Sequence, residues 1–535
     1  MFTLKKSAIA MYSQLDLTSL LYGVIVSVSF VLFLFLINRL TTWEYSIPKE
    51  VPWIDRRNEP LSYLRAKARS FTGGKDNVTK AYFEFNKLGR AAACAIAFGR
   101  PQVILPPKWI RWIIDQPDSV LSIDPIHDEF HAFVRDGLVG DHSVQEVLRK
   151  ELTHKLDRMT SDINDEICAA LDDVWGLSTE WRTLPVKEST RTIIARISNR
   201  IFVGKALCRN KDYIRNAVGL GKVVMPETVF QDILPKLLKG PVSTLIKAIN
   251  KIYLSGFNRR VGPLVRQRYI DVKNAEDGIG DKDQLPDELL TWMAQRAVRR
   301  GESTATVDQT LTSRVAMANL ASIETTTAAL DKSLSDLITF GEAGGYLAAV
   351  QEEALTVLTG CNYLPEKKDI QKLVHAENAL KESLRLAVAF PGLIRQVTSR
   401  NGVTLEDGLH LPFGTRLSVA ACGIHRDDAV WPDANTYNPA RYEMGADAAT
   451  SGSTQGIVSA MSRGTESFLA FGLGKRACPG RFFVTEELKL LFAHMFAKYE
   501  IKVAKSAQKA DPFAWLTVGG PQEQLMVRRK PDVGL

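Results

Sequence analysis

One short run near the carboxyl end constrains this chain more than any other part of its sequence. It reads Phe471-Gly-Leu-Gly474-Lys-Arg476-Ala-Cys478-Pro-Gly480 and sets a single cysteine in a frame of glycines, an aromatic ring and an arginine. A thiolate that binds a metal needs backbone N–H donors, nearby positive charge and little water. Such a frame arises by chance in about one chain in ten thousand of this length. The alternative is a buried structural cysteine, the usual state of a lone cysteine.

Each residue of this frame has a use if Cys478 binds the iron of a haem group. Gly474 and Gly480 let the backbone turn tightly and approach the porphyrin and the sulfur. Arg476 can pair with a haem propionate, and Phe471 can cover the sulfur. The frame therefore predicts that Cys478 is the axial ligand of haem iron and that its four companions bind the cofactor.

A second pattern lies upstream, where Glu382-Ser-Leu-Arg385 closes an apolar periodic stretch. This spacing places a carboxylate and a guanidinium on one face of a predicted helix. Alone, such a pair is more often an exposed ion pair that contributes less than about 1 kcal/mol to stability. The segment Tyr437-Asn-Pro-Ala-Arg441-Tyr442 adds a further arginine downstream.

The stretch from Asp308 to Phe340 contains no proline and is rich in alanine and leucine. It predicts a single helix of roughly 45 Å, long enough to cross a large globular domain beneath a cofactor. Inside it stand Glu324 and Thr325, an acid beside an alcohol. A helical threonine can also do no more than donate its hydroxyl to a carbonyl one turn earlier, and this interpretation stays open.

Together these segments resemble the cytochrome P450 family, whose haem-binding loop matches the Cys478 run. Glu324 and Thr325 match the family's oxygen-activating pair, and the segment around Arg441 looks like the family's Pro-Glu-Arg-Phe box with two substitutions. The resemblance covers roughly residues 51–530. It implies a mainly helical fold with a smaller β-rich lobe, and haem b bound through a cysteine thiolate.

The resemblance also implies roles for residues outside the cysteine loop. Arg395 stands where the family's second propionate-binding arginine falls, so Arg395 and Arg476 are expected to hold the propionates. Glu382, Arg385 and Arg441 are expected to form a buried network that holds the loop against the haem. Removing one member of such a network typically costs about 3–5 kcal/mol.

The same resemblance implies that Thr325 and Glu324 are catalytic. In the family, the threonine hydroxyl bonds to dioxygen on the iron and the neighbouring acid helps to relay the protons that oxygen activation consumes. The chain departs from the family at Ser322, where glycine usually opens a groove for dioxygen. This departure concerns the detail of oxygen binding and not the class of enzyme.

A second departure concerns the helix that usually donates to a propionate through a Trp-x-x-x-Arg motif. Residues 142–156 read as this helix but lack the motif, and His142 or Arg149 is expected to replace its contact. The pattern is most similar to fungal members of the ent-kaurene oxidase type and their relatives in secondary metabolism. Five basic residues are expected on the thiolate side, where family members dock an acidic reductase, although a solvated charged face explains each equally well. They are Arg149, Lys150, Lys155, Lys475 and Arg481.

The amino-terminal segment 17–38 carries no charge, and its core, residues 24–37, is almost wholly apolar. As a helix it would be about 33 Å long, which suits a hydrocarbon layer of roughly 30 Å. A secretory signal peptide has a shorter apolar region and a small-residue cleavage site, which does not follow here. Basic residues follow the segment more densely than they precede it, so the main body is expected in the cytosol. The predicted location is the endoplasmic reticulum membrane, with a single pass.

This interpretation divides the chain into four parts. Residues 1–16 form a short lumenal segment, 17–38 the transmembrane anchor, 39–60 a proline-containing linker and 61–535 one haem-thiolate monooxygenase domain. No repeat or second linker argues for further domains. Residues 445–464, rich in small and polar residues, predict a surface insertion.

The composition limits the kinds of partner and cellular compartment expected for this protein. Six scattered cysteines argue for a reducing compartment and against a disulfide framework or a zinc site. The net charge of +8 comes from dispersed basic residues without a nucleic-acid motif, so a membrane surface and an acidic redox partner are expected, and no nucleic acid. There is no Gly-x-Gly-x-x-Gly fingerprint and no flavin-binding region after Cys478. Electrons are therefore expected from NADPH through a separate cytochrome P450 reductase, with cytochrome b5 as a second candidate partner.

The resemblance thus implies a monooxygenase that inserts one oxygen atom from dioxygen into a lipophilic small molecule, such as a fungal terpenoid, polyketide or alkaloid. Two other classes stay open. The chain could be an enzyme of the same fold that rearranges, cyclises or desaturates its substrate without net oxygenation. It could also be a haem-binding sensor without turnover, which the full set of catalytic residues argues against.

Local patterns add four expectations. Residues 403–411 alternate around Asp407-Gly408, a strong signal for a two-residue hairpin. Residues 481–497 read as a helix whose amino end would lie against the haem. Residues 388–392 are expected to line the substrate side, and residues 516–520 resemble the family's carboxyl-terminal substrate loop.

Overall fold

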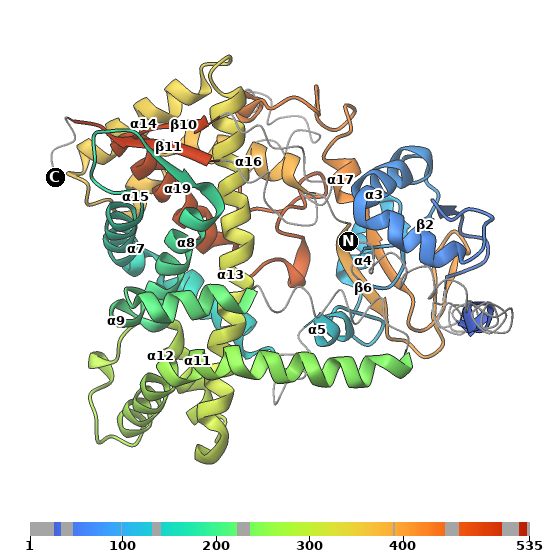
Figure 1. Ribbon diagram of the computed structural model, residues 1–535, viewed down its shortest axis with the longest axis horizontal. Coiled ribbons are helices and arrows are strands. Elements are labelled where there is room, and N and C mark those ends of the chain that lie inside the picture. The colour runs from blue at the N-terminus through green and yellow to red at the C-terminus, as the bar shows by residue number, and fades with distance from the viewer. Residues whose placement is uncertain are drawn as a thin grey trace, which may run out of the picture.

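Helices make up most of the described chain, and most strands gather in a smaller lobe (Figure 1). The computed structural model describes residues 26–30, 32–33, 47–97, 99–130, 141–221, 236–388, 391–443, 460–504 and 524–531. The helices are α3 (Ser62–Glu84), α4 (Ile110–Asp115), α5 (Asp124–Phe130), α6 (Ser143–Val147), α7 (Thr153–Val174), α8 (Val186–Val203), α9 (Lys205–Cys208), α11 (Lys236–Glu276), α12 (Leu289–Arg299), α13 (Thr304–Phe340), α14 (Tyr346–Gly360), α15 (Lys367–Ile370), α16 (Val374–Ala387), α17 (Ala421–Ile424) and α19 (Arg481–Lys498). The strands are β1 (Trp53–Ile54), β2 (Ala92–Cys94), β3 (Gln102–Leu105), β4 (Leu121–Ser122), β5 (Arg182–Pro185), β6 (Gly392–Val397), β7 (Val403–Thr404), β8 (His410–Leu411), β9 (Arg416–Val419), β10 (Tyr499–Ala504) and β11 (Gln524–Arg529). The predicted fold class, mainly helical with a smaller β-rich lobe, is confirmed.

The largest sheet has six strands in the order β1-β2-β3-β9-β6-β4. Strands β3 and β9 run parallel, with Val103 opposite Leu417, and β6 joins β9 in the antiparallel sense. Apolar residues of these strands form a core of their own with residues of α3 and α4. A smaller sheet, β10-β11-β5, lies beside α14 and α19 at the other end of the molecule (Figure 1).

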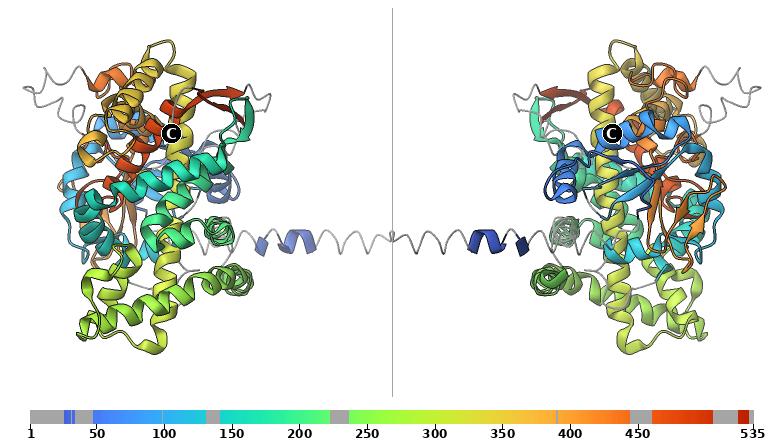
Figure 2. Two further views of the ribbon diagram at one scale, coloured as in Figure 1. Left: turned by 90° about the vertical axis from the view of Figure 1, so that its left-hand side faces the viewer. Right: turned by 90° about the vertical axis from the view of Figure 1, so that its right-hand side faces the viewer.

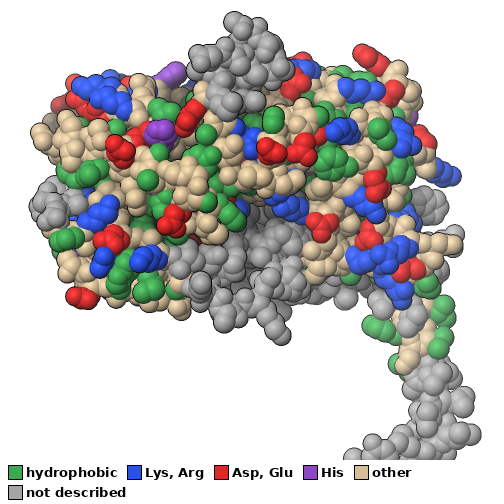
Figure 3. All heavy atoms as spheres, turned by 90° about the horizontal axis from the view of Figure 1, so that it is seen from above, with side chains coloured by type: hydrophobic (Ala, Val, Ile, Leu, Met, Phe, Trp, Pro, Cys, Tyr) green, Lys and Arg blue, Asp and Glu red, His purple; other side chains and the backbone are tan. Residues whose placement is uncertain are grey.

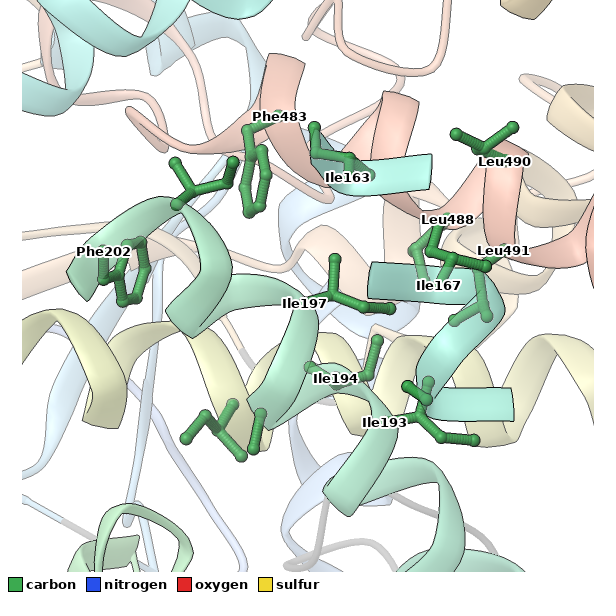
Figure 4. Packing of buried hydrophobic residues seen from close by; sticks show 14 of the residues in the cluster. Ile163, Ile167, Ile193, Ile194, Ile197, Phe202, Phe483, Leu488, Leu490 and Leu491 are labelled. Carbon is green, nitrogen blue, oxygen red and sulfur yellow. The ribbon is translucent and has the colours of Figure 1, made fainter. Parts of the chain in front are cut away.

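Helix α13 runs through the body of the molecule, and α8 packs along it (Figures 1 and 2). The larger core cluster draws on α7, α8, α13 and α19 (Figure 4). On α7 the buried residues Leu156, Ile163 and Ile167 recur at helical spacing, so one stripe of that helix faces the cluster. The helical core therefore holds the middle of α13 in a fixed position.

Helix α19 is a core helix on nearly all sides, because fourteen of its eighteen residues are buried. It starts at Arg481, directly after the cysteine loop, and ends at Lys498, where the chain turns into β10. The predicted helix over residues 481–497 is confirmed. The cysteine is thus attached to a helix that is buried on nearly all sides.

Three local predictions differ in detail from the structure. The long helix starts at Thr304, four residues before its predicted start. The helix expected over 142–156 begins at Ser143 and includes one π-helical turn, Leu148–Leu152. Strands β7 and β8 do pair, but five residues connect them, because the Gly408 N–H donates to the carbonyl of the buried Leu405 and the tight turn closes there.

No helix among the described ranges combines the length and the hydropathy that a membrane span requires. The predicted anchor at 17–38 is described only at residues 26–30 and 32–33, which are helical, with exposed apolar side chains such as Phe30. The anchor and the division into four parts therefore stay predictions. Residues 445–459 of the predicted insertion, and the whole of 516–520, lie outside the described residues.

Charged side chains of both signs cover the face of the molecule seen in Figure 3. Lys and Arg residues are interspersed there with Asp and Glu. This distribution matches the dispersed basic residues in the sequence.

Candidate functional site

The cysteine loop is closed by its own backbone. The N–H of Cys478 donates to the carbonyl of Phe471 over 2.8 Å, and the N–H of Ala477 donates to the carbonyl of Gly474 over 3.1 Å. Gly474 has a φ of +73°, and a Cβ atom there would lie 2.9 Å from Cβ of Ile114. Both facts call for glycine at this position. Phe471 packs against the larger core, so the loop is anchored before it reaches Cys478.

The sulfur of Cys478 lies at the amino end of α19, half-buried. Burial raises the pKa of the Cys478 thiol, whereas the backbone N–H groups of Gly480 and Arg481 and the Arg481 guanidinium lower it. Beside Gly480 the space is open, since an added Cβ would meet no atom of the described chain within 4 Å. A sulfur with N–H donors, a neighbouring cation and open space can carry the charge of a metal-bound thiolate.

Glu324 and Thr325 lie side by side on α13 but have different partners. Glu324 accepts a hydrogen bond from Nη2 of Arg191, on α8, over 2.8 Å. The Thr325 hydroxyl donates to the carbonyl of Ala321 over 2.6 Å, which is the bond that the sequence left open as an alternative. The Thr325 side chain is nevertheless exposed, as is Ala321, while Ile323 is buried. This face of an interior helix therefore borders open space, into which the oxygen lone pairs of Thr325 can accept.

Arg395 is a buried cation on β6, with 6% of its surface exposed. Its Nη1 donates to the carbonyl of Ile394 over 2.8 Å, and no carboxylate of the described chain accepts a hydrogen bond from it. Burial lowers the pKa of the Arg395 guanidinium, and the nearby guanidinium of Arg476 lowers it further. The carboxylates of Asp118 and Asp124 partly oppose this lowering of the Arg395 pKa, but neither accepts a hydrogen bond from Arg395. A buried guanidinium without a hydrogen-bonded carboxylate favours binding of a further anion.

Arg476 faces carboxylates on its outer side. It forms an ion pair with Asp118 and lies 3.6 Å from Oδ2 of Asp124. Nε2 of His142 lies 3.5 Å from the same oxygen. Of the two candidates for the missing propionate contact, His142 is thus the one that joins this cluster, because Arg149 is exposed and acts on the guanidinium of Arg481 instead.

Glu382, Arg385 and Arg441 form the expected network, and all three residues are buried. Oε1 of Glu382 accepts from Nη2 of Arg385 over 2.8 Å and from Nε of Arg441 over 3.0 Å. Burial opposes ionisation of Glu382, but the two guanidiniums hold its pKa below the usual value. Nη1 of Arg385 also donates to the carbonyl of Ala434 over 2.7 Å, which ties α16 to the segment that carries Arg441.

His425 connects this network to the cysteine loop, a role that the sequence did not reveal. Its Nδ1 faces the carbonyl of Arg385 at 3.0 Å, and its Nε2 accepts from the N–H of Leu469 over 2.8 Å. Burial lowers the pKa of His425 to about 3, so the ring is neutral and Nε2 can accept. The contact between Arg191 and Glu324 was likewise not predicted from the sequence. Both contacts join residues that are far apart in the sequence, which no local pattern shows.

The basic residues expected on the thiolate side are only partly brought together. Arg149 lies close enough to Arg481 to act on it electrostatically. Lys155 instead pairs with Asp287 over 2.8 Å and lies over the ring of Trp292.

The residues of the site fit haem. The open, N–H-supported sulfur of Cys478 suits an iron ligand, and Arg395 and Arg476 suit the anionic propionates. The buried charge of Arg395 is the sharpest sign of this fit, because burial of an unpaired guanidinium is otherwise costly.

Comparison with known proteins agrees with this geometry. Residues 143–528 match the family model described as "Cytochrome P450". The chain is 62% identical to cytochrome P450 monooxygenase ecdH of Aspergillus rugulosus over 96% of this chain and 98% of that protein. It is 55% identical to cytochrome P450 monooxygenase gloO of Glarea lozoyensis over 97% of this chain and 99% of that protein. The crystal structure of the cytochrome P450DA heme domain superposes with a TM-score of 0.66 at 16% identity, over 90% of this chain and 97% of that one.

Proposed function

The chain belongs to the cytochrome P450 family and is a monooxygenase, and we propose that its substrate is a lipophilic small molecule of fungal secondary metabolism. Two fungal monooxygenases that match it over nearly their whole lengths support this proposal. Its electrons come from NADPH through a separate cytochrome P450 reductase, with cytochrome b5 as a second candidate donor. The segment 17–38 anchors it in the endoplasmic reticulum membrane, with the catalytic domain in the cytosol.

Haem b, when bound, supplies the iron that activates dioxygen. Cys478 would bind this iron through its thiolate, and the N–H groups at the start of α19 together with Arg481 would balance the charge of the sulfur. Arg476 and Arg395 would bind the propionates, whose negative charge would balance the buried charge of Arg395. That buried charge is the observation on which this assignment rests.

On α13, Thr325 and Glu324 serve the delivery of protons. The Thr325 hydroxyl gives its own proton to the Ala321 carbonyl and presents its lone pairs to the open face. Glu324 is oriented by Arg191, on the neighbouring helix α8. This arrangement orients a hydroxyl and a carboxylate along one helix turn, where a proton can pass without bulk water.

A reduced carbon monoxide difference spectrum tests the assignment of Cys478. The wild-type chain in microsomes is expected to give the red-shifted Soret band of a thiolate ligand, and Cys478→Ala is expected to lose both the band and turnover. Cys361→Ala, at another half-buried cysteine, is the matched control and should keep the band. Turnover retained in Cys478→Ala would overturn the assignment. Product formed without label from labelled dioxygen would instead favour a rearrangement, cyclisation or desaturation.

A further inference from the structure

Lys498, the last residue of α19, has a fully buried side chain that forms no ion pair with a carboxylate of the described chain. Its Nζ donates a hydrogen bond of 3.3 Å to Sγ of Cys168, on α7, and lies 5.6 Å from the centre of the Tyr363 ring. Asp172, one turn further along α7, instead accepts from Nη1 of Arg529 over 2.8 Å. A buried amine that donates to a sulfur in place of a carboxylate is an unusual pairing, because a buried charge normally has an ionic partner.

Helices α7 and α19 bring Cys168 and Lys498 together because they pack against each other (Figure 1). Ile163 and Ile167 of α7 belong to the same apolar cluster as the leucines of α19 (Figure 4). Since this core fixes both helices, it also holds Nζ of Lys498 in contact with Sγ of Cys168. Cys168 is half-buried, so solvent and small molecules have access to it from one side.

The hydrogen bonds around His494 show how the thiol of Cys168 is oriented. Nδ2 of Asn164 donates to the Tyr363 carbonyl over 3.0 Å, so Oδ1 of Asn164 is the atom that accepts from Nε2 of His494, over 2.7 Å. Burial holds the pKa of His494 well below its usual value, so the ring is neutral and its Nδ1 is an acceptor. Nδ1 lies 3.7 Å from Sγ of Cys168. The thiol can therefore donate to His494 while a lone pair of the sulfur accepts from Lys498.

The charges around Cys168 act on its ionisation in opposite directions. Burial and the carboxylate of Asp172 raise the pKa of the Cys168 thiol, whereas the ammonium of Lys498 and the guanidinium of Arg529 lower it. The thiol therefore ionises less readily than an exposed cysteine, but its thiolate lies beside a cation once it forms. The feature that sets this cysteine apart is the amine in contact with its sulfur.

We propose that Cys168 and Lys498 form a redox modification site, at which hydrogen peroxide converts the pair to a sulfenamide that links α7 to α19. A sulfenic acid condenses with a nitrogen nucleophile in this way when the two groups are in contact. The hydrogen bond of 3.3 Å between Nζ and Sγ provides that contact before any reaction takes place. The site needs only peroxide, so it does not rest on the proposed substrate or redox partner.

The reaction balances in two steps. The thiol of Cys168 loses its proton to solvent on its exposed side, and the thiolate attacks one oxygen of the peroxide, which breaks the O–O bond and gives a sulfenic acid and hydroxide. The hydroxide takes a proton from the ammonium of Lys498 and becomes water. Nζ then attacks Sγ, the S–O bond breaks, and the hydroxyl group leaves with a proton of the amine as a second water. The sulfur loses two electrons and the peroxide gains them, and a thiol reductant reverses the link.

Mass spectrometry of the peroxide-treated, haem-loaded protein tests the site. A digest of the wild-type protein should contain a peptide that joins Cys168 to Lys498 and is about 2 Da lighter than the sum of its two parts, because two hydrogen atoms are lost. Dithiothreitol should separate this peptide into its parts. A sulfenic or sulfinic acid at Cys168 beside an unmodified Lys498 would overturn the proposal, and so would a Cys168 that peroxide leaves unmodified.

Two variants separate the amine from the cation. Lys498→Arg keeps a positive charge beside the sulfur but removes the amine, so the yield of the joined peptide should fall by about tenfold or more. Dimedone, which traps sulfenic acids, should then label Cys168 in this variant. Cys168→Ser should abolish the joined peptide. Cross-linking of Cys168 in Lys498→Arg at the wild-type yield would overturn the proposal, because another group would then be the partner of the sulfur.

Cys361 supplies a matched control within the same protein. It is also half-buried, but its Sγ donates to the Leu358 carbonyl over 3.4 Å, and no lysine of the described chain donates to it. Cys361→Ala should leave the link between Cys168 and Lys498 unchanged. Equal cross-linking of Cys361 to lysines in the wild-type protein would show unspecific oxidation and overturn the proposal. These outcomes are distinct from failure of the proposed function, which would appear as loss of the thiolate-type carbon monoxide band before peroxide is added.

Discussion

The hydroxyl of Tyr442 donates a hydrogen bond of 2.8 Å to Oε2 of Glu382, the carboxylate at the centre of the buried network. The family box that this segment resembles usually ends in phenylalanine, so the tyrosine adds a donor to an acid that already accepts from Arg385 and Arg441. The backbone N–H of Asn438 gives a further bond, of 3.0 Å. Both carboxylate oxygens of Glu382 therefore accept hydrogen bonds from buried donors.

Tyr442→Phe should destabilise the fold by about 1.5–3 kcal/mol, the usual contribution of a hydrogen bond to a charged group. Urea unfolding of the holoenzyme measures this change. Tyr346→Phe, which removes a hydroxyl that donates to the neutral amide of Asn438, is the control and should cost about 1 kcal/mol or less. Equal costs for the two variants would contradict the ionised state of Glu382.

Glu382→Gln should cost more than loss of the tyrosine hydroxyl. It leaves two buried guanidiniums without their carboxylate, for which about 3–5 kcal/mol is typical. The expected result is a protein that retains little haem when expressed, measured as the ratio of Soret to protein absorbance. Glu352→Gln, at an exposed position of α14, should leave that ratio unchanged.

Arg395→Met should have opposite effects on the haem-free and haem-loaded proteins. Without haem, it removes a buried cation that has no carboxylate partner in the described chain, so the apoprotein should become more stable. With haem, it removes a propionate contact, so haem should transfer to an acceptor protein about tenfold faster or more. Arg400→Met, at an exposed arginine, should change neither quantity. A variant that destabilises the apoprotein would show that Arg395 already has an anionic partner.

Thr325→Ala should uncouple the consumption of NADPH from product formation and release peroxide, because the hydroxyl on the open face of α13 is lost. Thr310→Ala is a close control on the same helix, since the Thr310 hydroxyl also donates to a carbonyl one turn earlier, over 3.0 Å. If NADPH consumption and product formation stay coupled in Thr325→Ala, the hydroxyl of Thr325 only caps a helix carbonyl and does not serve catalysis.

The stability of the protein should fall as the pH is lowered from 6.5 towards 3. Burial lowers the pKa of His425 from 6.5 to about 3, so in this window the unfolded chain binds a proton that the folded chain does not. Each such histidine contributes a slope of about 1.4 kcal/mol per pH unit, and the full stability is present above pH 6.5. Urea unfolding across the window measures the slope, which His425→Phe should reduce. His410→Phe, at an exposed histidine, should retain it.

Most of the features that the sequence predicted correctly came from short motifs with fixed spacing. The helical fold, the long helix around Thr325 and the meeting of Glu382, Arg385 and Arg441 follow from short patterns whose members have fixed roles in a known family. The turn after Val403 was predicted with Asp407-Gly408 at its centre. In the structure the Gly408 N–H donates to the Leu405 carbonyl, so the turn has Glu406 and Asp407 at its centre, one residue earlier, and the neighbouring Leu405 is buried.

Partners that come from distant parts of the chain could not be predicted in this way. Arg191 reaches Glu324 because α8 packs along α13, and Ser198 reaches Ser322 through the same packing. Hydrophobic spacing says that two helices are amphipathic, but it does not say which polar residues will face each other across their contact. Such pairs become visible only when the helices are placed in space.

The burial of α19 on nearly all sides has a consequence for how enzymes of this kind can diversify. A substitution in that helix disturbs the core of the protein before it can adjust the chemistry at Cys478. New selectivity must then arise elsewhere, in segments whose side chains are free to vary without loss of folding. In a library of variants of this protein, most substitutions in α19 should prevent folding, whereas most substitutions in exposed connections should be tolerated. Substrate specificity can therefore change in the connections while α19 and the chemistry at Cys478 stay the same.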